Sequence, residues 1–455
     1  MVFSSIEFLF VFLPAVLLIY YILPKKLKNL FLLLANIVFY AYGEPVYVLL
    51  MIGSIILNFV AGKIIEKVKH KRLWLAFFMV VNLSALGFFK YTPFVFDTLR
   101  GITGLSFLPD VKIALPIGIS FYTFQASSYL VDVYRKECKA SCSIVDFATY
   151  ISLFSQLIAG PIVRYIDVEK QLRERTHSFE NFNSGIKTFT VGLAKKVLLA
   201  NKLGILWEIA SKNPEGMGTA GVWIGAIAYT LQIYFDFSGY SDMAIGLGKM
   251  LGFDFCINFN YPYIAKSITD FWRRWHISLS TWFRDYVYIP LGGNRVNKGR
   301  FCFNLMVVWA LTGLWHGAGW NFVVWGLYYG VLLLAEKLFV GKLLKKLPSA
   351  VTHIYTLAVV IVGWIFFAGE SFGHSAKYLK LMFTPNSTPS FIYGGIITIV
   401  IGIISAIPLG KNIYNKFKDK KYMYVAETVV CLALLVLSTA ALVSDSYNPF
   451  LYFRF

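Results

Sequence analysis

Charged residues are scarce in this chain of 455 residues, where they make up 15% of the total against 57% hydrophobic residues. A soluble domain of this size needs more charge at its surface, so the composition excludes a soluble globular protein. Apolar stretches of spanning or near-spanning length recur along the whole chain. They lie near residues 6–23, 30–42, 46–62, 73–89, 113–131, 147–162, 220–235, 239–256, 303–334, 351–368, 391–409 and 425–443. We therefore expect an all-α polytopic membrane protein, with residues 1–455 forming one integral-membrane domain.

Cysteine is also rare, and the five cysteines suggest neither a disulfide framework nor a metal site. Their number is odd, and the close pair Cys138 and Cys142 has no second His/Cys pair nearby. A zinc site normally needs such a second pair. We expect no bound metal.

The sequence shows no internal repeat, and its first apolar run does not have the pattern of a cleavable leader. The missing repeat argues against a transporter built from inverted halves. The first apolar run, residues 6–23, has no basic residue before it and no small-residue cleavage site after it. We expect a retained first span rather than a signal peptide.

Positive charge is present in excess, with a net charge of +19. The basic residues fall in short runs between apolar stretches, at 25–28, 63–72, 164–175, 342–346 and 411–421. This pattern is typical of cytoplasmic loops. We therefore expect contact with anionic membrane lipid and not with nucleic acid. With these runs on the cytoplasmic side, the N-terminus is expected to be extracytoplasmic.

The segment TGLWHGAGWN, residues 312–321, places His316 among glycines and tryptophans. Both flanking runs, near 300 and 342–346, are expected to be cytoplasmic. Each arm of residues 303–334 has about 14 residues, or about 21 Å of helix, less than a hydrocarbon core of about 30 Å. We predict a re-entrant hairpin with His316 at its tip.

A neutral imidazole at that tip can take a proton from a hydroxyl group that attacks a thioester. Backbone N–H groups at the glycine turn can stabilise the oxyanion. A structural, hydrogen-bonded histidine is the alternative. We expect Trp315 and Asn321, beside His316, to contact substrate.

Residues 270–288 form a second unusual segment, in which aromatic side chains follow one helical stripe. This predicts an amphipathic helix in the membrane interface. Arg273 and Arg284 on one edge are expected to line an entry for a phosphorylated donor, although a simple surface anchor is the alternative. His276, at the border of the stripe, is either functional or tied to a backbone carbonyl.

Asp236 and Asp242 are acids inside an apolar stretch, and buried acids are often functional. We favour helix capping at a break near Ser238 and Gly239, and keep Asp236 as a candidate for substrate binding.

Four motifs in order carry a family resemblance. They are QIYFDFSGYSDMAIG at 232–246, DFWRRWHISLSTWFRDY at 270–286, PLGGNR at 290–295 and LTGLWHG at 311–317. With the opening MVFSSIEFLF and the closing NPFLYFRF, they resemble the membrane-bound O-acyltransferase (MBOAT) superfamily. Within it, they resemble the membrane subunits of bacterial alginate O-acetyltransferases and related peptidoglycan O-acetylation proteins.

This resemblance implies a ring of tilted helices around a central tunnel, with His316 and His276 as catalytic residues. It implies cytoplasmic acetyl-CoA as donor substrate, with no bound cofactor, and a location in the bacterial cytoplasmic (inner) membrane. The partner would be an extracytoplasmic SGNH-type esterase or transferase that modifies a cell-envelope polysaccharide.

The C-terminal aromatic tail, residues 444–455, resembles a tyrosine-bearing motif of such export systems. Tyr452 is then expected to accept the acetyl group as a covalent relay. An aromatic interface anchor is the alternative.

Two other functions remain open. The first is transfer of D-alanine to teichoic acid, and the second is a transporter or flippase that moves an acyl donor without chemistry.

Overall fold

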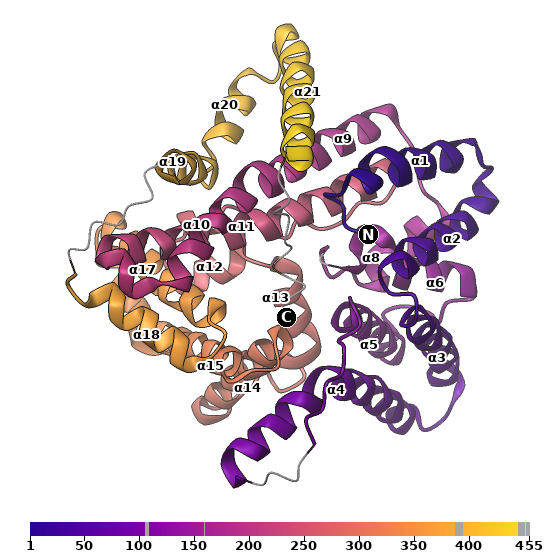
Figure 1. The fold of residues 1–455 in the computed structure, drawn as a ribbon. Helices are drawn as coiled ribbons and strands as arrows, with labels where there is room; N and C mark the ends of the chain where they lie inside the picture. The colour runs from indigo at the N-terminus through magenta and orange to yellow at the C-terminus, as the bar shows by residue number, and fades with distance from the viewer. Residues whose placement is uncertain (105–108, 159, 387–394, 445–450, 452–455) are drawn as a thin grey trace. The chain divides into compact units, whose positions relative to one another are not determined.

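The fold is entirely helical in the residues that the computed structural model describes, which are 1–104, 109–158, 160–386, 395–444 and 451. The chain forms two compact units (Figure 1). The first unit comprises residues 1–189 and 243–256, and the second comprises residues 190–242 and 257–455. Helices α9 and α11 each contribute to both.

The first unit buries a cluster of phenylalanine rings and contains a buried pair of asparagines. Asn58 and Asn82 exchange two hydrogen bonds, of 2.9 and 2.8 Å, between α3 and α4. Such pairing is needed where water is excluded. The helices are η1 (Phe8–Phe12), α1 (Leu13–Ile22), α2 (Lys25–Gly43), α3 (Val48–Lys67), α4 (Lys71–Thr103), α5 (Ile119–Arg135), α6 (Ile144–Ser152), α7 (Phe154–Leu157), α8 (Tyr165–Arg173), the first part of α9 (Phe179–Ala194) and the last part of α11 (Gly218–Met250).

The second unit contains both histidine motifs. Its core is rich in tryptophan, with Trp325 and Trp364 at most 1% exposed. Besides the remainder of α9 and α11, its elements are η2 (Lys195–Ala200), α10 (Asn201–Lys212), η3 (Pro214–Met217), η4 (Pro262–Ile264), α12 (Ile268–Arg274), α13 (Ile277–Phe283), η5 (Arg284–Tyr288), α14 (Lys298–His316), α15 (Trp320–Ala335), η6 (Glu336–Val340), α16 (Gly341–Leu344), α17 (Ser349–Ala368), α18 (Phe372–Phe383), α19 (Ile396–Ser405), α20 (Leu409–Phe417) and α21 (Lys421–Ser444).

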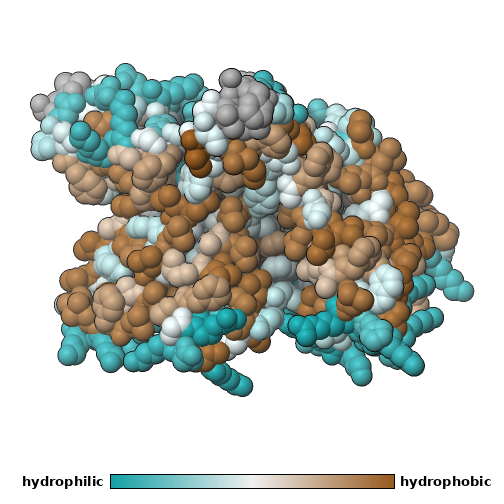
Figure 2. Space-filling model, turned by 90° about the horizontal axis from the view of Figure 1, so that it is seen from below, coloured by the Kyte–Doolittle hydropathy of each residue, from teal (hydrophilic) through white to brown (hydrophobic). Residues whose placement is uncertain are grey.

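Apolar helices of membrane-crossing length are present in both units. In the described part of the chain, five helices are long and apolar enough to cross a membrane, or six if the bent pair α19 and α20 forms one span. On the face drawn in Figure 2, hydrophobic residues cover a broad area and hydrophilic residues gather at its margins. Exposed apolar surface on this scale needs a lipid environment. The chain is a multi-pass membrane protein.

Helix α11 corrects one expectation from the sequence. It runs unbroken through Ser238 and Gly239, where we expected a helix break. Gly239 instead permits close packing, because a Cβ atom there would lie 2.7 Å from the carbonyl oxygen of Gly192 in α9. The glycine therefore marks a helix contact and not a helix end.

Helices α14 and α15 form the predicted hairpin, joined by Gly317–Gly319. Both arms are longer than the apolar stretch suggested, since α14 has 19 residues and helical structure from Trp320 to Leu344 covers 25. The depth of its tip in a bilayer stays a prediction. Two glycines allow the arms to touch: a Cβ atom on Gly313 would overlap the carbonyl oxygen of Phe322, and one on Gly326 would overlap that of Trp309.

We predict that Gly326→Ala destabilises the protein by about 1–3 kcal/mol, because the added methyl group meets rigid backbone. The measurement is thermal unfolding of the purified protein in detergent. Gly53→Ala in α3 is the matched control, since nothing lies within 4 Å of a Cβ atom there. Equal melting temperatures for the two variants would contradict the close packing of α14 on α15.

Candidate functional site

The segment that contains His276 is not the continuous interfacial helix that we expected. Helix α12 ends at Arg274, α13 begins at Ile277, and His276 between them has φ of 45° and ψ of 55°. Left-handed backbone is uncommon for a residue with a side chain and often marks a functional position. The apolar stripe is covered by protein and not by lipid. Six of its seven members are at most 8% exposed, namely Phe271, Trp272, Trp275, Leu279, Trp282 and Phe283, and the seventh, Tyr286, is partly exposed.

The segment around Asn258 holds His276 in this corner. The backbone of Asn258 bonds to the residue after His276, since Ile277 N–H donates to the Asn258 carbonyl oxygen at 3.0 Å. The Asn258 side chain continues the pairing: its Oδ1 accepts from Ser278 N–H at 3.2 Å and from the Ser278 hydroxyl at 2.9 Å. A backbone N–H can only donate, so the amide oxygen must face the corner.

The same oxygen fixes the tautomer of His276. The distance between His276 Nδ1 and Asn258 Oδ1 is 3.1 Å. Because that oxygen is an acceptor, Nδ1 carries the proton and Nε2 keeps its lone pair. Nε2 has no hydrogen-bond partner among the described residues. Burial also lowers the pKa of this imidazole, to about 3. His276 is therefore a neutral ring whose Nε2 carries an available lone pair.

His316 is the last residue of α14 and is 5% exposed. Aromatic rings surround it, with centroid distances of 5.1 Å to Trp325, 5.2 Å to Phe367 and 5.0 Å to Trp315. Gly317 accommodates this cage, because a Cβ atom there would overlap the Phe322 ring.

The structure brings the two histidines together. Their ring centroids are 6.4 Å apart, although they are 40 residues apart in sequence. Trp315 lies beside both rings, with its centroid 6.0 Å from that of His276. Its predicted contact with substrate is consistent with this position and stays a prediction.

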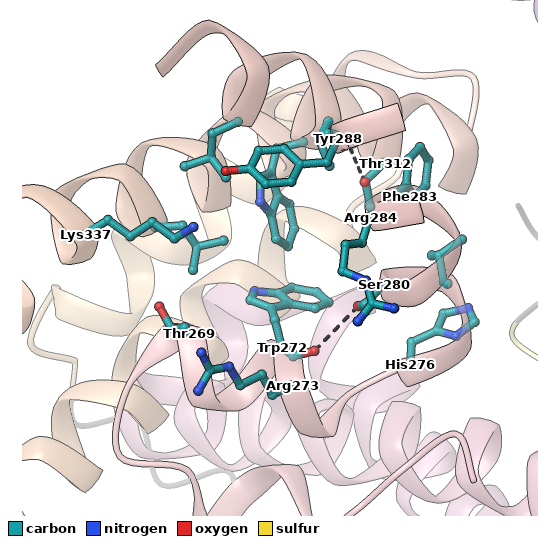
Figure 3. A pocket seen from close by; sticks show the side chains of 15 residues that line it. Thr269, Trp272, Arg273, His276, Ser280, Phe283, Arg284, Tyr288, Thr312 and Lys337 are labelled. Atoms are coloured by element: carbon teal, nitrogen blue, oxygen red, sulfur yellow. Dashed lines mark hydrogen bonds between the residues drawn. The ribbon is translucent and has the colours of Figure 1, made fainter. Parts of the chain in front are cut away.

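A pocket of about 220 Å³ is lined by His276 and by three cationic side chains. Arg273, Arg284 and Lys337 line it, and Figure 3 shows Arg273 and Lys337 on one side of the Trp272 ring, with Arg284 nearer to His276. Most of the remaining wall is apolar, from Leu279, Phe283, Leu305, Val308, Trp309 and Leu333. The two arginines predicted to line an entry therefore do line one pocket together with His276.

The sequence did not indicate Lys337 and Asn258 as site residues. In the sequence, Lys337 only precedes the basic run 342–346. The fold brings it into the same pocket as Arg273. Its neighbour Glu336 positions this end of the pocket, since its carboxylate accepts from Ile268 N–H at 2.7 Å and from Thr269 N–H at 2.9 Å at the start of α12. Asn258 lies in the loop before η4, with no motif to mark it.

Two further candidates make contacts within the protein. Asn321 Nδ2 donates to the carbonyl oxygen of Gly369 at 2.8 Å, which ties the start of α15 to the end of α17. Asp236 forms an ion pair of 2.6 Å with Lys196, and both side chains are at most 3% exposed. Its second oxygen accepts from Leu451 N–H at 2.9 Å.

Tyr452, the next residue, lies outside the described residues, as does most of the tail 444–455. In the described part of the chain, no group of three or more His, Cys, Asp or Glu side chains is placed to hold a metal ion.

Comparison with known proteins shows the family of this chain. The model of the membrane-bound O-acyltransferase family matches residues 67–372. A probable alginate O-acetylase of Pseudomonas aeruginosa is 44% identical over 393 residues, which cover 84% of this chain and 75% of that protein. A peptidoglycan O-acetyltransferase of Helicobacter pylori is 34% identical over 522 aligned positions, which cover 100% of this chain and 98% of that protein. A teichoic acid D-alanyltransferase of Bacillus subtilis is 28% identical over 57% of this chain. The chain belongs to the membrane-bound O-acyltransferase family, and it is a membrane acyltransferase.

Proposed function

We propose that this chain takes an acetyl group from cytoplasmic acetyl-CoA and passes it across the bacterial cytoplasmic membrane. The final acceptor is an extracytoplasmic cell-envelope polysaccharide, such as an alginate-like polymer or peptidoglycan, reached through an SGNH-type partner. One observation carries the donor assignment: a single pocket is lined by three cationic side chains and by a neutral histidine. The acceptor assignment rests on the names of the two O-acetylating relatives.

The pocket fits the two ends of an acyl-CoA. Arg273 and Lys337 supply the positive charge that phosphates need, and arginine binds phosphate with two parallel hydrogen bonds. Arg284 lines the same pocket but already forms an ion pair of 2.7 Å with Asp285. The apolar wall suits the uncharged arm that links the phosphates to the thioester. The thioester is then delivered toward His276 and the neighbouring His316.

In the proposed reaction, an acceptor hydroxyl attacks the thioester carbonyl carbon. A new C–O bond forms, the C–S bond breaks, and the CoA sulfur leaves as a thiolate that takes up a proton. We assign the general base to His316. His276 is a second proton acceptor, because its Nδ1 proton is held by Asn258 and its Nε2 lone pair is available. In this tautomer Nε2 cannot donate a hydrogen bond to the thioester oxygen.

Tyr452 is proposed as the first acceptor of the acetyl group. The contact of Leu451 with the buried Asp236–Lys196 pair supports this, since it fixes the residue that precedes the tyrosine.

Intact mass and peptide mapping after incubation with acetyl-CoA test the reaction. We expect one acetyl group on Tyr452 of the wild type, and none in His316→Ala or Tyr452→Phe. If CoA is released only with a partner present and Tyr452→Phe is fully active, the relay is excluded and the acyltransferase remains. If acetyl-CoA is never consumed while a D-alanyl carrier is, the donor assignment is wrong.

Removing two of the positive charges that line the pocket tests the donor site. Arg273→Gln with Lys337→Gln is expected to raise KM for acetyl-CoA by about tenfold or more, because charged hydrogen bonds to phosphate are lost. The kcat/KM for S-acetylpantetheine, which lacks phosphate, should not change. Lys345→Gln with Lys346→Gln removes the same charge outside the pocket and serves as control. Equal losses of kcat/KM with both donors would contradict phosphate binding by Arg273 and Lys337.

The pH profile tests the proton acceptor. Burial holds the pKa of His276 low, so its basic form persists at acidic pH. Asn258→Asp places a carboxylate against Nδ1–H, which favours the imidazolium and raises the pKa of His276. The acid limb of the kcat/KM profile should therefore move to higher pH. Asn260→Asp, an exposed neighbour, should leave the limb in place. An unmoved limb in Asn258→Asp would mean that protonation of His276 does not limit the reaction and that the general base, His316, sets the profile.

A further inference from the structure

A second pocket, of about 680 Å³, lies in the first unit, away from both histidine motifs in the sequence. The start of α2, the start of α6 and the segment 172–177 after α8 form its wall. The sequence places its basic run 25–28 on the cytoplasmic side of the membrane.

The pocket has a strong excess of positive charge. Five cationic side chains line it against two carboxylates, Asp146 and Glu174. Of the cations, only Arg173 forms an ion pair within the described residues, at 3.4 Å to Glu169. The other four are Lys25, Lys26, Lys28 and Arg175.

Lys28 is the most informative of these residues. Its side chain lines the pocket but is only 8% exposed, and it forms no ion pair among the described residues. Its ammonium group lies over the rings of Tyr20 and Tyr21, at 4.4 and 5.1 Å from the centroids. Burial of an ammonium group without an anion is unfavourable. Burial, and then the nearby Arg175 and Lys25, lower the pKa of Lys28 accordingly.

The neighbouring groups are fixed before any ligand arrives. Arg175 Nη2 donates to Asn29 Oδ1 at 2.5 Å, and Arg175 Nε donates to the Tyr20 hydroxyl at 3.1 Å. Asn29 Nδ2 in turn donates to Asp146 Oδ1 at 2.6 Å and to the Leu172 carbonyl oxygen at 2.7 Å. This network holds the guanidinium group beside Lys28 and reduces the entropy cost of binding.

We propose that this pocket binds a phosphate group, carried by an anionic phospholipid headgroup or by a free phosphate compound. The surrounding surface favours the lipid. From the pocket, α2 presents an exposed apolar stripe along which acyl chains can lie, with exposures of 43–59%, formed by Leu27, Leu30, Leu34 and Val38. This site is independent of acyl transfer, and its ligand would link the first unit to the anionic leaflet.

The test uses the full-length protein, stripped of lipid in detergent, and native mass spectrometry. The probes are phosphatidylglycerol, phosphatidylcholine with the same acyl chains, and glycerol 3-phosphate. We expect at least tenfold preference for phosphatidylglycerol over phosphatidylcholine. Lys26→Gln with Lys28→Met should abolish that preference. Lys67→Gln with Lys69→Gln removes two exposed charges elsewhere and should retain it.

Each remaining outcome decides the proposal. Binding of glycerol 3-phosphate as tight as that of phosphatidylglycerol, lost in the pocket variant, supports a phosphate site whose source is soluble. Equal retention of phosphatidylglycerol in the pocket and control variants overturns the proposal. Because Lys28 is buried, Lys25→Gln with Lys26→Gln provides a second variant at exposed positions. Its unchanged preference, together with an unfolded Lys28 variant, would also overturn the proposal.

Discussion

The amide oxygen of Asn258 is the contact on which the proposed chemistry depends. One atom accepts from the Ser278 backbone, the Ser278 hydroxyl and His276. It fixes a left-handed corner between two short helices, and it decides which nitrogen of His276 is basic. The hydrogen bond of one ring nitrogen sets the tautomer of an imidazole, and here a fixed protein acceptor provides that bond. The corner, the tautomer and the direction of proton transfer therefore share one cause.

Close packing brings the second histidine to the same place. Glycines at 313 and 326 let α14 and α15 approach to backbone contact, and the turn after His316 leaves its ring among Trp325 and Phe367. The buried pair of Lys196 and Asp236 has a comparable role at the C-terminal tail. Its carboxylate satisfies the ammonium group and a backbone N–H at once, as an interior without water requires. The Asn258 amide and the Lys196–Asp236 pair thus each hold a segment of backbone in place.

Several features of the fold follow from the sequence alone, because they depend on local pattern. Helical membrane architecture, the hairpin around His316 and the joint position of Arg273 and Arg284 belong to this group. The stripe from Phe271 to Phe283 shows the limit of such reasoning, since a helix face covered by protein has the same composition as one covered by lipid. Asn258 and Lys337 were missed for another reason. Asn258 contacts residues 18 and 20 positions away, and Lys337 lines a pocket with a residue 64 positions away, which no periodicity records.

The locked tautomer of His276 has a bioenergetic consequence. Histidines that exchange protons at both ring nitrogens can pass them from one side of a barrier to the other. Here Nδ1 keeps its proton, so a proton accepted at Nε2 must return by the same nitrogen. The ring can serve a reaction and still block a proton wire. For the proposed transfer of acyl groups across an energised bilayer, such a ring would avoid dissipating the proton gradient at the active site.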